Sequence, residues 1–105
     1  MAAPPLSRDI FHTSSVLMPQ PLVSIALPTK NRAFLLADCI RCALDQSYLN
    51  IELVVADNDD TGATQEVVVG FNDPRLRYVK TGGLSMPDNW EHAFRSTRGE
   101  IITML

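Results

Sequence analysis

Hydrophobic and polar positions along the chain fall into blocks that predict a strand, a helix and a second strand in turn. Aliphatic and β-branched residues fill positions 22–28 and 51–56, and the second block is apolar at nearly every position. Continuous apolar character is typical of a strand that is covered on both faces of a parallel sheet. Between the two blocks, apolar residues recur at helical spacing from Leu36 to Leu44, which predicts a helix over 33–46.

The second half of the chain repeats this alternation with shorter elements. We expect a helix over 64–71, a strand over 76–80, a helix over 88–97 and a strand over 101–105. The third helix is expected to begin near Asp88, because a carboxylate at a helix start accepts hydrogen bonds from free backbone amides. Strands that alternate with helices predict an α/β fold, with a mainly parallel sheet flanked by helices and right-handed crossovers.

Composition limits the chain to one domain and argues against nucleic-acid binding and a transmembrane segment. Residues 1–20 show no sustained periodicity and are expected to form a disordered tail, so residues 21–105 form the domain. The net charge of −3 argues against nucleic-acid binding, which usually needs a basic patch. No apolar run approaches the roughly 18 residues of a transmembrane helix, and no signal peptide is recognisable. We therefore expect a cytoplasmic location, with membrane association left open for the complete protein.

Polar residues follow each of the first two predicted strands. Pro-Thr-Lys-Asn-Arg occupies 28–32, and Ala-Asp-Asn-Asp occupies 56–59. The loops after parallel strands meet at the carboxyl edge of the sheet, where open α/β proteins bind ligands. With the segments 72–79, 85–90 and 98–102, these motifs resemble, in order, the amino-terminal, nucleotide-binding half of family 2 glycosyltransferases.

The resemblance implies a Rossmann-like GT-A half-domain whose site lies on these loops. It assigns Thr29 and Asp57 to the nucleoside, and a carboxylate suits the N–H donor of a uracil ring. The start of the 33–46 helix would favour the diphosphate, because helix amino termini attract anions. UDP-sugar is the expected donor. The expected nucleotide-binding residues are Pro28, Thr29, Asn31, Arg32 and Asp57.

The resemblance also implies an activity for the complete protein. Family members transfer a sugar from a nucleotide-sugar to an acceptor, using magnesium or manganese held by acids beyond the fourth strand. Neither those acids nor a catalytic base can be assigned here. We therefore expect part of a longer transferase, a truncated gene product or a domain completed by a partner. In each case the chain is expected to be inactive alone, without a metal or catalytic residue of its own. The apolar strand at 101–105 is expected to be an exposed edge that favours self-association.

Two other functions remain open on the sequence. Asp57, Asp59 and Thr61 after an apolar strand are similar to the first motif of haloacid dehalogenase-type phosphatases, in which the first Asp attacks phosphorus. Alternatively, the chain is a non-catalytic interaction domain. Cys39 and Cys42 have the spacing of a redox pair, but they fall inside a predicted helix and we expect them to pack as small apolar side chains.

Overall fold

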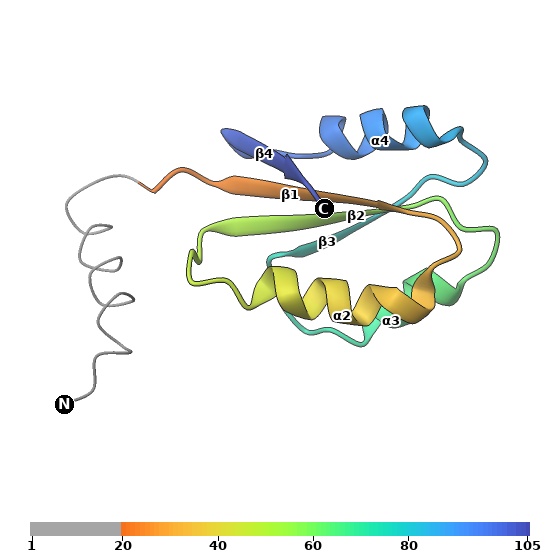
Figure 1. Ribbon diagram of the computed structural model, residues 1–105, viewed down its shortest axis with the longest axis horizontal. Helices are drawn as coiled ribbons and strands as arrows, with labels where there is room; N and C mark the ends of the chain where they lie inside the picture. The colour runs from red at the N-terminus through yellow and green to blue at the C-terminus, as the bar shows by residue number, and fades with distance from the viewer. Residues whose placement is uncertain (1–19) are drawn as a thin grey trace.

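The computed structural model describes residues 20–105 as a sheet flanked by helices (Figure 1). Every predicted element is present in the predicted order, with ends that differ from the predicted ones by a few residues at most. The tail predicted for 1–20 lies, up to residue 19, outside the described part of the chain. The elements are β1 (Val23–Thr29), α2 (Ala33–Leu44), β2 (Ile51–Asp57), α3 (Ala63–Val69), β3 (Leu76–Lys80), α4 (Met86–Arg95) and β4 (Ile101–Met104).

The sheet is entirely parallel, and its strand order is β3-β2-β1-β4. β1 and β2 pair from Val23 opposite Ile51 to Thr29 opposite Asp57, so the two predicted ligand-binding loops leave the sheet side by side. Helices α2 and α3 cover one face and α4 covers the other, as Figure 1 shows. This three-layer arrangement confirms the predicted α/β class and puts the loops after β1, β2 and β3 at one edge.

The two faces of the sheet are packed with side chains of very different size. Beneath α2 and α3, large aliphatic residues such as Leu53 and Ile40 form the main core. Under α4 the buried apolar contacts come from three alanines, Ala26, Ala56 and Ala93. Small side chains let α4 lie close to β1 and β2, which places the start of α4 beside the β1–α2 loop.

A buried carboxylate joins the end of α4 to the sheet. Glu52, which is 6% exposed, accepts hydrogen bonds from the Ser24 hydroxyl, the Arg77 guanidinium and the Arg98 amide. Burial alone would raise the pKa of Glu52, but these hydrogen bonds and the Arg77 charge hold it below its ordinary value. Gly99 is required beside this cluster, because a Cβ there would lie 2.5 Å from the Ser24 Oγ.

One predicted helix start is wrong. Helix α4 begins at Met86, and its N-cap is Ser85, whose hydroxyl accepts a hydrogen bond from the Asp88 amide over 3.2 Å. Asp88 therefore lies in the first turn, and its backbone N–H donates to the hydroxyl of the Ser85 cap. A serine cap followed by proline in the first turn is a standard helix start, and the sequence carries it as Ser85, Met86 and Pro87.

Candidate functional site

A pocket of about 680 Å³ opens at the carboxyl edge of the sheet, between the β1–α2 loop and the start of α4. We call it the carboxyl-edge pocket. Four of the five predicted site residues line it, all from the β1–α2 segment. The full lining is Pro28, Thr29, Lys30, Asn31, Arg32, Asn58, Leu84, Ser85, Met86, Asn89, Trp90 and Leu105.

Two basic side chains at this pocket form no ion pair within the described residues. Lys30 and Arg32 are exposed, and neither side chain makes an ion pair or hydrogen bond within residues 20–105. Helix α2 begins at this point with no acidic residue in its first turn and no side-chain cap. The amino end of a helix carries partial positive charge, so all three features favour an anion at the same place.

Thr29 offers a polar group that the fold leaves available. The residue is 8% exposed and lines the pocket, and its hydroxyl has no hydrogen-bond partner among residues 20–105. A hydroxyl is both a donor and an acceptor. The Thr29 hydroxyl can therefore bind a ligand without breaking a hydrogen bond within residues 20–105.

Asn31 is held against the loop that follows β2. Its φ of 54° is the only positive value for a non-glycine residue in the described chain. Its backbone N–H donates to the Asp59 carboxylate, its Nδ2 donates to Asp60 Oδ2 over 3.0 Å, and its Oδ1 accepts from the Asp60 amide over 3.2 Å. The side chain that the sequence assigned to a ligand is thus hydrogen-bonded within the protein.

Asp57, the fifth predicted site residue, lies outside the lining of this pocket. It is 0% exposed, and its carboxylate accepts hydrogen bonds from the Tyr78 hydroxyl and the Asp59 amide and lies 3.6 Å from Lys80 Nζ. The pKa of Tyr78 is raised well above its ordinary value, mainly by burial and next by the hydrogen bond to Asp57. Asp57 therefore forms a buried contact between β2 and β3.

Several lining residues were not singled out as site residues from the sequence. Asn58, the neighbour of Asp57, has an amide that bonds both the N–H and the carbonyl of Leu84, which fixes the β3–α4 loop. Asn89 is 3% exposed and donates to the Ala56 carbonyl over 3.3 Å. The resemblance had marked the 85–90 segment as a motif, but its helical context gave no sign that it would face the β1–α2 loop.

The wall opposite the cations is apolar. Met86 and Trp90 stand one turn apart on α4, and Leu105 adds a third apolar side chain. Trp90 keeps 48% of its surface exposed. The carboxyl-edge pocket is therefore amphipathic, with two free cations on one side and an apolar surface that includes an indole ring on the other.

The acids at this edge do not fit a metal ion. No group of three or more His, Cys, Asp or Glu residues within 20–105 is arranged to hold one. Asp57 is occupied by Tyr78, and the Asp59 carboxylate, 4% exposed, accepts from the Asn31 amide and the Thr64 hydroxyl. Both carboxylates are thus buried and already engaged in hydrogen bonds within the protein.

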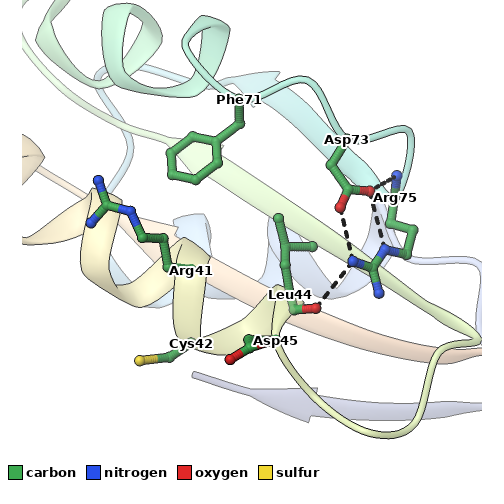
Figure 2. Close-up of a pocket in the computed structure, with 7 residues that line it drawn as sticks. All are labelled: Arg41, Cys42, Leu44, Asp45, Phe71, Asp73 and Arg75. Carbon is green, nitrogen blue, oxygen red and sulfur yellow. Dashed lines mark hydrogen bonds and ion pairs between the residues drawn. The ribbon is translucent and has the colours of Figure 1, made fainter.

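A second pocket, of about 490 Å³, lies at the opposite end of the sheet, where α2 ends and β3 begins (Figure 2). We call it the amino-edge pocket. Arg75 binds Asp73 through two guanidinium nitrogens and donates to the Leu44 carbonyl over 3.0 Å, which ties the end of α2 to β3. Arg41 pairs with Asp38 at 2.8 Å and lies 5.9 Å from the centre of the Phe71 ring. Both arginines are thus paired within the fold.

The cysteines are reduced and differ in burial. Cys39 is half-buried against the main core, as expected, whereas Cys42 is exposed on α2 and lines the amino-edge pocket. The expectation that both pack as apolar side chains is therefore wrong for Cys42, because it falls on the solvent side of the helix.

Comparison with known proteins gives consistent matches. The model of the family described as glycosyl transferase family 2 matches residues 24–105. WcaA of Escherichia coli K12, which carries the name of a colanic acid biosynthesis glycosyl transferase, is 39% identical over 89 residues, covering 79% of this chain and 31% of WcaA. Chondroitin synthase of Escherichia coli is 31% identical over 96 residues, covering 88% of this chain and 14% of that protein.

A solved structure has the same fold. The mannosyltransferase PcManGT from Pyrobaculum calidifontis, in complex with GDP-Man and Mn²⁺, superposes with a TM-score of 0.70 at 24% identity, over 95% of this chain and 34% of that one. This match supports the predicted Rossmann-like GT-A architecture. The chain spans about a third or less of each of these proteins. Within residues 20–105, no helix is both long and apolar enough to cross a bilayer.

Proposed function

Because the chain belongs to glycosyl transferase family 2, we propose that its carboxyl-edge pocket binds the nucleoside diphosphate part of a nucleotide-sugar donor. The complete protein would transfer the sugar from that donor to an acceptor. The donor sugar and the acceptor would be selected by parts of the protein beyond this chain.

The free cations at the pocket are the observation that carries this proposal. Lys30 and Arg32 lie just before the first residue of α2, which has no side-chain cap, and no acidic residue lines the pocket to compete for them. A diphosphate would gain charge-assisted hydrogen bonds from both side chains and from the helix amides. The Thr29 hydroxyl, which has no partner within residues 20–105, would bind the nucleoside.

The contact between Asp57 and a uracil ring stays a prediction. As an alternative, because the Asp57 carboxylate is fully buried and bonded to Tyr78, we propose that it supports the site from beneath. Asn58 also lines the pocket, but its side-chain amide already bonds the N–H and the carbonyl of Leu84, so it supports the site in the same way. We keep uridine as the expected base. PcManGT was solved with GDP-Man, so guanosine nucleotides belong in the same test.

A divalent metal, magnesium or manganese, is proposed for the complete enzyme only. PcManGT holds Mn²⁺, whereas the acids of residues 20–105 do not fit one. Such an ion would stabilise the charge of the departing diphosphate. We accordingly propose that this chain alone is inactive, and an assay for nucleotide-sugar hydrolysis with added Mn²⁺ tests that: turnover would contradict it.

Calorimetry on the 105-residue chain tests the binding itself. UDP and GDP are titrated at low ionic strength, with either EDTA or Mn²⁺ present. We expect saturable binding of at least one nucleotide that does not require the metal and that weakens as salt is added, because the contacts are ionic. Absence of binding by both nucleotides in both buffers would refute the proposal.

The structure opposes one of the two alternative functions, a phosphatase, and leaves the other, a non-catalytic interaction domain, to experiment. A phosphatase would need Asp57 to attack a phosphoester, but its side chain is fully buried and bonded to Tyr78. The fold and the family match therefore both oppose that function. A non-catalytic interaction role stays a competing prediction, and it predicts that neither nucleotide binds. The cytoplasmic location also stays a prediction.

We also propose that the chain self-associates through β4. This strand is at the end of the sheet order, and Ile101 and Ile102 are 52% and 40% exposed. An unpaired apolar edge is a template for pairing with another strand. Sedimentation should show oligomers that Ile102→Lys reduces, and a monomer at all concentrations would contradict this.

A further inference from the structure

We propose that Asn31 is a positioning residue, which holds the diphosphate-binding cations toward the pocket by clasping the β1–α2 loop to the loop after β2. This inference rests on the proposed function, since it concerns the same pocket. It assigns Asn31 a role different from the direct nucleotide contact that the sequence suggested.

The clasp consists of hydrogen bonds made by the backbone N–H and by the side-chain amide of Asn31. The backbone N–H is held by Asp59, which is itself fixed by the hydroxyl of the buried Thr64 on α3. The side-chain amide exchanges two hydrogen bonds with Asp60, one to the carboxylate and one from the backbone amide. Nearby, the backbone N–H of Asn58 donates to the Thr29 carbonyl over 2.9 Å. The two loops are therefore joined at three consecutive positions after β2.

The position of Asn31 between the two cations gives the clasp its effect. Lys30 precedes it and Arg32 follows it, and the left-handed backbone at φ 54° turns the chain between them. Asparagine tolerates this conformation better than most residues do. Once the clasp is lost, residues 30–32 can adopt other backbone conformations, and Lys30 and Arg32 are no longer held together in the lining of one pocket.

Asp60 allows the clasp to be separated from direct ligand contact. It is exposed and does not line the pocket, so its substitution cannot remove a lining group. Asp60→Ala and Asp60→Asn remove the same negative charge, but only asparagine keeps an oxygen that can accept from Asn31 Nδ2. Charge alone predicts that both variants bind an anion more tightly than the parent.

The test is calorimetry of the full chain with UDP, uridine and inorganic pyrophosphate. We expect Asp60→Ala to bind UDP and pyrophosphate about fivefold more weakly than Asp60→Asn, the difference of one hydrogen bond, while uridine affinity stays equal in the two. Asn31→Ala should lose about tenfold or more, and Asn31→Gly, which accepts positive φ, should lose less. Asp38→Asn, a charge-matched change in the middle of α2 that does not touch the pocket lining, should leave UDP affinity within about twofold of the parent.

The outcomes separate the proposal of nucleotide binding from the proposal that Asn31 positions the cations. Equal pyrophosphate affinity in Asp60→Ala and Asp60→Asn would overturn the clasp, and so would a parallel loss for uridine, because that would indicate general structural damage. Pyrophosphate binding without UDP binding would refute the nucleotide proposal and leave the clasp measurable. A parent chain that binds no anion would overturn both. Since Asp60 is exposed, its variants are expected to fold even if Asn31→Ala does not.

Discussion

The two pockets of this domain contain a similar number of basic residues but differ in how those residues are paired. At the amino edge, Arg75 is bonded to Asp73 and to the Leu44 carbonyl (Figure 2). Arg41 there pairs with Asp38. At the carboxyl edge, Lys30 and Arg32 have no partner within residues 20–105. Paired cations stabilise the fold, whereas unpaired cations beside a helix start remain available to a ligand.

The difference in pairing shows why pocket size alone does not identify a site. Both pockets are within the size range of small-molecule sites, at about 490 and 680 Å³. A ligand at the amino edge would have to displace existing ion pairs. At the carboxyl edge a bound anion would supply the missing partner, so only that pocket gains electrostatic energy on binding.

Removing both free cations should have the largest effect on binding. In the double variant Lys30→Ala with Arg32→Ala, two charge-assisted hydrogen bonds are lost. We expect the free energy of UDP binding to weaken by about 3 kcal/mol, so that calorimetry no longer detects saturable binding. The melting temperature should change little, because neither side chain bonds to the rest of the described chain. Unchanged affinity in this variant would place the ligand elsewhere.

Arg75→Ala should produce the opposite result. It removes the ion pair with Asp73 and the bond to the Leu44 carbonyl, so we expect the free energy of unfolding to fall by about 1 to 2 kcal/mol. UDP affinity should be unaffected. Urea denaturation checks the first expectation and calorimetry the second. A loss of UDP affinity in a folded variant would mean that the two pockets are coupled.

The amino-edge ion pair also predicts a pH dependence. Hydrogen bonds from Arg75 hold the pKa of Asp73 below its ordinary value of 3.8. A carboxylate with a lowered pKa in the folded state stabilises the fold above the unfolded pKa, and this contribution is lost as pH falls through the folded value. Stability measured from pH 5 downward should therefore decline less steeply in Asp73→Asn than in the parent. The same decline in both would show that Asp73 does not contribute.

Cys42→Ser should have the smallest effect. The thiol is exposed and reduced and has no hydrogen bond in the described chain, so stability is expected to stay within about 0.5 kcal/mol and UDP affinity to stay unchanged. A larger loss of binding would give the amino-edge pocket a functional role that its pairing does not indicate.

The fold was predictable because its signals are local or periodic. The continuous apolar run at 51–56 indicated a central strand, and β2 is indeed paired on both sides. The resemblance to family 2 glycosyltransferases, carried by motifs such as 28–32, is confirmed by the family match. The start of α4 was misplaced because its prediction depended on Asp88 as the cap, whereas the N-cap is Ser85 and Asp88 lies in the first turn.

The site was only partly predictable, because it depends on contacts between distant residues. Residues 28–32 share one loop, so their common position followed from the sequence. The environment of Asp57 is set by Tyr78, on another strand, and no local pattern indicates that this hydroxyl would bond the carboxylate. The contribution of Trp90 likewise depends on how α4 packs over the small side chains of Ala26 and Ala56.

The most direct test of the central claim is to map UDP binding on the ¹⁵N-labelled 105-residue chain by NMR. We predict that amide shifts change around 29–32, Asn58 and 84–90, while the amides of 41–45 and 71–75 stay constant. Shift changes confined to the amino-edge pocket, or none at all at saturating UDP, would contradict the account.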